Sequence, residues 1–202
     1  MAGFGCSGQL KSGAAVPAPP LARLANRPVR LALIGQSNAN LSRPVFAQLT
    51  GILSLAPTEA NGPVIACWDA VPATPPIGQC WPALARAIAH VPMDAFVFWQ
   101  GESDIDNPRY GAALADLVGR VRATVGNPSL LIVLMQYGPA YSGHLNGSEV
   151  QSQLWAAQDA HAMWVPTRDL EFLPDGGHMT PAGYSAAAER IVSLVRRRLG
   201  GE

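Results

Sequence analysis

A short stretch of small and polar residues follows the first apolar run of this chain. Residues 35–39 read Gly-Gln-Ser-Asn-Ala and come directly after the run Leu31–Ile34. A strand that ends in such a turn leaves the Ser37 hydroxyl at its carboxyl end, where open α/β sheets bind their ligands. A serine becomes a nucleophile only when a base takes its proton. The same residues also suit an ordinary turn, so this stretch alone leaves both interpretations open.

Two further stretches could complete a catalytic site. Residues 99–104 read Trp-Gln-Gly-Glu-Ser-Asp after another apolar run, and residues 175–180 read Asp-Gly-Gly-His-Met-Thr. The carboxyl ends of parallel strands meet at one edge of a sheet, so these stretches are expected to converge there. His178, three residues after Asp175, can face that edge while the carboxylate binds its other ring nitrogen. Ser37, His178 and Asp175 would then be the nucleophile, base and orienting acid of a Ser-His-Asp triad.

The elements that must position these residues alternate along the chain. Short apolar runs bounded by Gly, Pro, Asp or Asn predict five buried strands, and amphipathic segments predict helices between them. The strands are Leu31–Ile34, Val64–Trp68, Ala95–Trp99, Leu130–Met135 and Ala162–Val165; the helices are Ser42–Leu55, Trp81–His90, Pro108–Val125, Ser148–Ala160 and Pro181–Leu199, the last with Thr180 as its N-cap. Such alternation predicts an α/β fold, a three-layer α/β/α sandwich around a five-stranded, flavodoxin-like parallel sheet.

Taken together, the three stretches resemble the motifs of the SGNH (GDSL-like) hydrolase superfamily. They look most like its sialate O-acetylesterase branch, which includes the carbohydrate esterases of family six, and the Thr-Pro-Ala-Gly-Tyr tail at residues 180–184 extends the resemblance. The resemblance implies the SGNH hydrolase fold, with Ser37 as nucleophile and its own N–H as one oxyanion donor. Gln100 would donate its side-chain amide where the superfamily usually has an asparagine. Gly78 would be the second backbone donor, in a degraded glycine-rich turn that has Cys80 where another glycine is expected.

The acid partner of His178 has two candidates. In some relatives the glutamate of the second motif, here Glu102, is taken as the partner in place of the aspartate. We predict that Asp175 orients His178 and that Glu102 shapes the site, with the alternative left open. No set of His, Cys or acidic residues has metal-ligand spacing, and no glycine-rich loop ends in the Lys-Ser or Lys-Thr of a phosphate site, so no cofactor is expected.

The function predicted on this basis is a serine esterase. It would remove small acyl groups, acetyl above all, from carbohydrate or related polyol esters through an acyl-enzyme. One alternative is a broader hydrolase of lipid or aryl esters or thioesters on the same fold. Another is a non-catalytic carbohydrate-binding or structural module that retains the motifs, which the degraded turn around Gly78 favours.

Composition narrows the other possibilities. The 202 residues suit one domain, predicted at residues 29–202 after an irregular Gly- and Pro-rich arm at residues 1–28. Lys plus Arg and Asp plus Glu each number 14. The chain therefore has no net positive charge that would favour binding to nucleic acid. No apolar run approaches the roughly 20 residues of a membrane span. Charged residues are only 14%, against about 25% in typical domains, which is compatible with a homo-oligomer.

The location of the protein and the state of its cysteines follow from weaker signals. No signal peptide is visible, so a cytoplasmic location is the default expectation, with export by another route or a truncated chain left open. Of the three cysteines, Cys67 and Cys80 could pair. Reduced thiols are the expectation for a chain without a secretory signal.

Overall fold

A parallel β-sheet forms the centre of the molecule. A computed structural model of the chain describes residues 29–49, 65–68 and 80–200. The strands within these residues are β1 (Leu31–Gly35), β2 (Ala95–Trp99), β3 (Leu131–Met135) and β4 (Ala162–Val165), all parallel and in the order β1-β2-β3-β4. The α/β prediction is confirmed. The described part of the chain contains four strands of this sheet where five were predicted.

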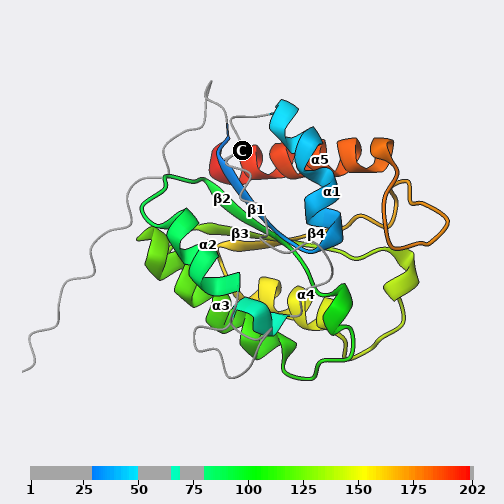
Figure 1. Cartoon of the computed structure of the whole chain (residues 1–202), viewed down its shortest axis with the longest axis horizontal. Helices are drawn as coiled ribbons and strands as arrows, with labels where there is room; N and C mark the ends of the chain where they lie inside the picture. The colour runs from blue at the N-terminus through cyan, green and yellow to red at the C-terminus, as the bar shows by residue number, and fades with distance from the viewer. Residues whose placement is uncertain (1–28, 50–64, 69–79, 201–202) are drawn as a thin grey trace, which may run out of the picture.

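Helices cover both faces of this sheet. They are α1 (Ser37–Leu49), α2 (Cys80–Ile88), α3 (Tyr110–Val125), α4 (Ser148–Gln158) and α5 (Pro181–Gly200), with short 3₁₀ turns η1 (Ile65–Trp68), η2 (Glu102–Asp104) and η3 (Pro139–Tyr141). Figure 1 shows α1 and α5 on one face and α2, α3 and α4 on the other. The three layers match the sandwich predicted from the alternation of strands and helices.

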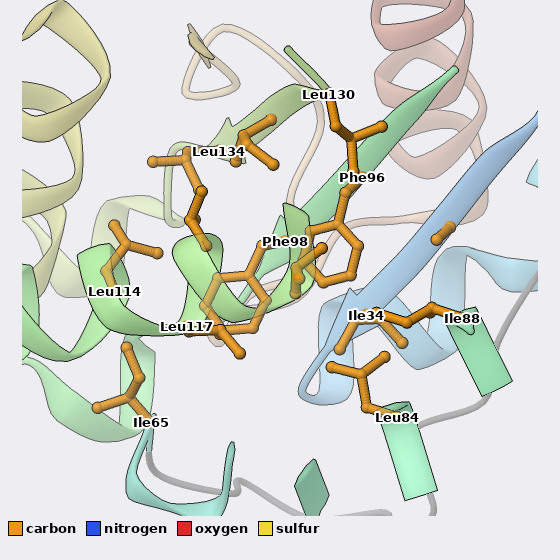
Figure 2. Packing of buried hydrophobic residues seen from close by; sticks show 14 of the residues in the cluster. Ile34, Ile65, Leu84, Ile88, Phe96, Phe98, Leu114, Leu117, Leu130 and Leu134 are labelled. Atoms are coloured by element: carbon orange, nitrogen blue, oxygen red, sulfur yellow. The ribbon is translucent and has the colours of Figure 1, made fainter. Parts of the chain in front are cut away.

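Successive strand side chains point to opposite faces of the sheet and so build two cores. Leu33 and Val97 pack with residues of α1 and α5, whereas their neighbours Ile34 and Phe98 pack with residues of α2 and α3. In Figure 2 the side chains of Phe96 and Phe98 lie among leucine and isoleucine side chains from the covering helices. Burial on both faces explains why these strands read as continuous apolar runs.

The strand predicted at Val64–Trp68 is wrong. Residues 65–68 form the 3₁₀ turn η1. The backbone N–H of Ile65 donates to the Asp104 carboxylate at 2.6 Å, and the Ile65 and Cys67 side chains are buried against α2 and α3. A short apolar run can be buried in either conformation, and here a side-chain carboxylate takes the backbone donor that a strand would have given to a neighbour.

Cys67 and Cys80 form a disulfide that joins η1 to the first residue of α2. Their Cα atoms are 5.1 Å apart and their positions differ by 13 in the sequence. The expectation of reduced thiols is therefore wrong for this pair. That expectation was based on the cellular compartment, whereas pairing also requires that the fold bring the two residues together.

We expect reduction of this disulfide to lower the free energy of unfolding by about 3 kcal/mol, the loop-closure value for a loop of this size. Urea unfolding with and without a reductant measures the difference. The Cys67→Ser/Cys80→Ser variant should match the reduced protein and show no response to reductant. Equal stability of the oxidised and reduced chains would contradict the prediction.

The helix predicted to start near Ser42 begins five residues earlier. α1 starts at Ser37, and its first backbone bond runs from Asn40 N–H to the Gln36 carbonyl at 3.0 Å. The Ser42 hydroxyl donates to the Ala39 carbonyl inside the helix, so it does not cap a helix start. At α5 the prediction is confirmed, because Thr180 Oγ1 accepts the N–H of Gly183 at 3.1 Å and Pro181 is the first helical residue. The predicted arm at residues 1–28 lies outside the described residues.

Candidate active site

The start of α1 and the segment before α5 meet at the carboxyl edge of the sheet. β1 passes directly into α1, so Ser37 lies at the first turn of the helix. A Cβ atom on Gly35 would collide with the carbonyl of Trp99, so only glycine permits this close approach of β1 to β2. α5 packs against α1 on the same face, as Figure 1 shows. The loop that precedes α5 therefore brings His178 to Ser37, although the two residues are 141 positions apart in the sequence.

Ser37, His178 and Asp175 form a continuous chain of hydrogen bonds. The Ser37 hydroxyl lies 2.9 Å from His178 Nε2, and His178 Nδ1 lies 2.7 Å from Asp175 Oδ2. A carboxylate only accepts, so Nδ1 carries the ring proton and Nε2 accepts from the serine. This geometry is that of a nucleophile next to a base whose tautomer is set by an acid.

The Asp175 carboxylate is held as an anion by donors around it. Its Oδ1 accepts the backbone N–H groups of Gly177 and His178, each at 2.9 Å. The backbone bond from His178, followed by the side-chain bond to the same residue and the bond from Gly177, lowers the pKa of Asp175 to about 2. Asp175 is thus ionised throughout the neutral range and suited to stabilise an imidazolium.

The three side chains are open to a substrate. The side chain of His178 is 34% exposed and that of Asp175 is 50% exposed, while Ser37 is partly buried. An ester carbonyl can therefore approach the serine from solvent. The N–H groups of the first turn of α1 precede the first intrahelical bond, so they have no partner within the helix.

The Gln100 side chain is buried and hydrogen-bonded to its neighbours. Its Nε2 donates to Asp104 Oδ2 at 2.6 Å, and its Oε1 accepts the Tyr110 hydroxyl at 3.0 Å. Its backbone carbonyl accepts the hydroxyls of Tyr110 and Tyr137 at 2.8 and 3.0 Å. The oxyanion role of Gln100 stays a prediction, because the amide nitrogen that would donate to an oxyanion donates here to Asp104. Gly78 lies outside the described residues.

Gln36 joins the first motif to the second. Its backbone N–H donates to the Trp99 carbonyl at 3.0 Å, and its Oε1 accepts the N–H groups of Gly101 and Ser103 at 3.3 and 3.4 Å. Gly101 has φ = 138°, and a Cβ atom there would collide with the Tyr137 hydroxyl. Glycine is required at this position, and the turn after β2 is fixed against the turn that carries Ser37.

The Glu102 side chain is buried, and Asn38 donates a hydrogen bond to it. Oε1 of Glu102 accepts Asn38 Nδ2 at 2.9 Å, whereas Oε2 is buried with no hydrogen-bond partner among the described residues. Burial is the main cause that raises the pKa of Glu102 to about 7; the bond from Asn38 and the charge of His178 oppose it. His178 Nδ1 contacts the Asp175 carboxylate, whereas Glu102 contacts Asn38. The role of Asp175 as the orienting acid stays a prediction.

The raised pKa of Glu102 should make folding stability depend on pH. Between its ordinary pKa of 4.5 and about 7, the folded chain binds more protons than the unfolded chain, so stability falls as pH rises. The full loss is on the order of 3 kcal/mol. Glu102→Gln should remove this decline in urea unfolding between pH 4.5 and 8, whereas Glu189→Gln, at an exposed position of α5, should retain it. The same decline in the Glu102→Gln variant would refute the prediction.

Sequence reasoning did not single out three polar residues of this region. Gln36 and Asn38 flank Ser37, and Tyr184 ends the tail motif. Asn38 Nδ2 donates to the Gly177 carbonyl at 2.9 Å, and the Tyr184 hydroxyl donates to Asn38 Oδ1 at 2.7 Å. Their presence inside the quoted motifs was the available signal, but nothing in the sequence showed which residues they contact.

Neither a metal-binding cluster nor a membrane-spanning helix occurs among the described residues. Within residues 29–49, 65–68 and 80–200, no three His, Cys, Asp or Glu side chains gather in a way that could hold a metal ion. In the same part of the chain, no helix combines the length and apolar character needed to span a bilayer.

Comparison with known families decides the relationship. Residues 39–196 match the family described as carbohydrate esterase, sialic acid-specific acetylesterase. The chain belongs to this family. The match includes the second motif and the Asp175–His178 loop and begins two residues after Ser37. Membership places the chain among ester hydrolases and confirms the resemblance to the sialate O-acetylesterase branch of the SGNH hydrolases.

Two solved structures are similar to this chain in fold. A protein from Arabidopsis thaliana has 18% sequence identity and a TM-score of 0.57, over 79% of this chain and 67% of that protein. A carbohydrate acetylesterase from Xanthomonas citri has 16% identity and a TM-score of 0.58, over 80% of this chain and 41% of that enzyme. At these identities the likeness shows the shared fold. No curated protein matches the sequence.

Proposed function

We propose that this esterase-family chain removes acetyl groups from carbohydrate esters by a Ser-His-Asp mechanism. The observation that carries the proposal is the unbroken chain from Asp175 Oδ2 to His178 Nδ1 at 2.7 Å and from His178 Nε2 to Ser37 Oγ at 2.9 Å. A serine that already donates to an oriented imidazole is prepared for attack on an ester carbonyl.

The reaction would proceed in two halves. Ser37 Oγ attacks the acetyl carbonyl while its proton passes to His178 Nε2. The tetrahedral intermediate expels the sugar alkoxide, which takes that proton from His178 and leaves an acetyl-serine. Water, deprotonated by His178, then attacks the acetyl-serine; acetate leaves and the proton returns to Ser37. Asp175 remains a carboxylate and stabilises the imidazolium in both halves.

The first turn of α1 supports the oxyanion. The backbone N–H of Ser37 lies at a helix N-terminus, where unbonded N–H groups and the helix dipole favour negative charge. Gln100 and Gly78 are the additional donors that the family resemblance implies. The substrate class rests on the family name, carbohydrate esterase, and an open site with small residues beside Ser37 suits a short acyl chain on a bulky alcohol.

Two assays test this function. The first measures release of acetate from acetylated xylan and from acetylated sialic acid. The second measures hydrolysis of p-nitrophenyl esters of increasing acyl length. We expect turnover of at least one acetylated carbohydrate and a steep decline in kcat/KM beyond the butyryl ester. A profile that rises with longer acyl chains would favour a lipid or aryl esterase. If the wild-type protein hydrolyses every ester no faster than the Ser37→Ala variant does, the esterase proposal is refuted and a sugar-binding module is favoured.

A further inference from the structure

The Asn38 side chain connects three segments that lie far apart in the sequence. It is 2% exposed, and its amide nitrogen donates to Glu102 Oε1 and to the Gly177 carbonyl, both at 2.9 Å. Its amide oxygen accepts the Tyr184 hydroxyl at 2.7 Å. The carboxylate and the backbone carbonyl face the amide nitrogen as acceptors, so the amide has one orientation.

The residues joined in this way are the immediate neighbours of the reacting groups. Asn38 follows Ser37, and Gly177 precedes His178. The bond from Asn38 to the Gly177 carbonyl therefore ties the turn that carries the base to the helix that carries the nucleophile. A displacement of that turn would lengthen the 2.9 Å contact between His178 Nε2 and Ser37 Oγ.

Glu102 and Tyr184 hold the Asn38 amide from two sides. Glu102 is 6% exposed, and its other carboxyl oxygen has no partner among the described residues. Burial of a carboxyl with one oxygen unbonded is costly, and the side chain that donates to this carboxyl is Asn38. His178 Nδ1, the atom that an orienting acid would contact, is already bonded to Asp175. Tyr184 reaches Asn38 from α5.

We propose that Asn38 is a positioning residue that fixes the His178 turn against Ser37, and that Glu102 acts on the reaction through Asn38 and not as a second acid on His178. This inference rests on the proposed function, because the expected changes in kcat assume that the chain is an esterase. It assigns a role to the buried Glu102 that differs from an acid partner, and it gives Tyr184 a part in the site.

The test compares two readouts across one set of variants. The first is kcat and KM for p-nitrophenyl acetate. The second is the rate at which a fluorophosphonate labels Ser37, which reports activation of the serine independently of any sugar. Asn38→Ala should lower both kcat and the labelling rate by about 10²-fold, the effect of a misplacement near 1 Å, with little change in KM. Asn40→Ala, the same substitution two residues along α1, should leave both unchanged.

Glutamate variants separate positioning from acid catalysis. Gln at position 102 can still accept from Asn38 Nδ2, so Glu102→Gln should be at least about tenfold more active than Glu102→Ala. Glu102→Ala combined with Asn38→Ala should add little to the loss of either alone, because both break one unit. Circular dichroism and thermal melting of each variant show that the fold is retained.

The outcomes distinguish this inference from the proposed function. Wild-type labelling of Ser37 without hydrolysis of any acetylated sugar would overturn the substrate assignment, while the labelling series would still decide the positioning role. Equal labelling of the wild type and Asn38→Ala would overturn that role. Equal losses in Glu102→Gln and Glu102→Ala would overturn the statement that Glu102 acts through Asn38.

Discussion

Ser37→Ala and His178→Ala should each lower kcat for acetate release by about 10³- to 10⁶-fold, as removal of either member of such a unit does. Alanine at position 37 leaves no nucleophile, and alanine at position 178 leaves the hydroxyl without the base now 2.9 Å away. The double variant should be barely slower than either single variant, because the two side chains act together. Steady-state rates on p-nitrophenyl acetate and on an acetylated carbohydrate measure these losses.

Matched substitutions elsewhere in the chain provide the controls. Ser193→Ala on α5 and His161→Ala before β4 remove the same groups from exposed positions and should leave kcat within about twofold, as expected for surface substitutions. Persistence of wild-type turnover in Ser37→Ala would place the nucleophile elsewhere. Losses that simply multiply in the double variant would show that Ser37 and His178 do not act as one unit.

Asp175→Asn should lower kcat by about 10⁴-fold while leaving KM nearly unchanged. The substituted amide would donate to His178 Nδ1 and shift the ring proton to Nε2, where it blocks proton transfer from Ser37. Because the pKa of Asp175 is lowered to about 2, the acid stays ionised at every pH of an ordinary assay. Rates measured from pH 5 to pH 9 should therefore show the loss across the whole range.

The same acid should affect stability in the opposite direction to Glu102. Its pKa in the folded chain lies below the ordinary value of 3.8, so its contribution to folding stability is present above that value and is lost as pH falls toward 2.

The matched control for the effect of Asp175→Asn on kcat is Asp169→Asn, which removes an exposed carboxylate paired with Arg190 and should have little effect. Wild-type activity in Asp175→Asn, together with a large loss in Glu102→Gln, would assign the orienting acid to Glu102.

Most of the fold was predictable because β1, β2 and β3 are buried on both faces. Four of the five predicted apolar runs are strands within a residue or two of their expected bounds. The exception, residues 65–68, is equally apolar but too short for periodicity to separate a strand from a 3₁₀ turn. The early start of α1 was missed for a similar reason, since Ser37 and Asn38 suit a turn as well as a first helical residue.

The chemistry of the site and the contacts that hold it have different origins. Residue types and the order of the motifs were enough to predict Ser37, Asp175 and His178 as the reacting groups, because residues placed after strands or before a helix meet at one edge of a parallel sheet. The structure brings these three side chains within hydrogen-bond distance of one another. Only the tertiary structure decided that Asn38 bonds both Glu102 and Gly177, and that Cys67 pairs with Cys80. Such contacts depend on ångström-scale packing between segments far apart in the chain, and a linear pattern does not contain those distances.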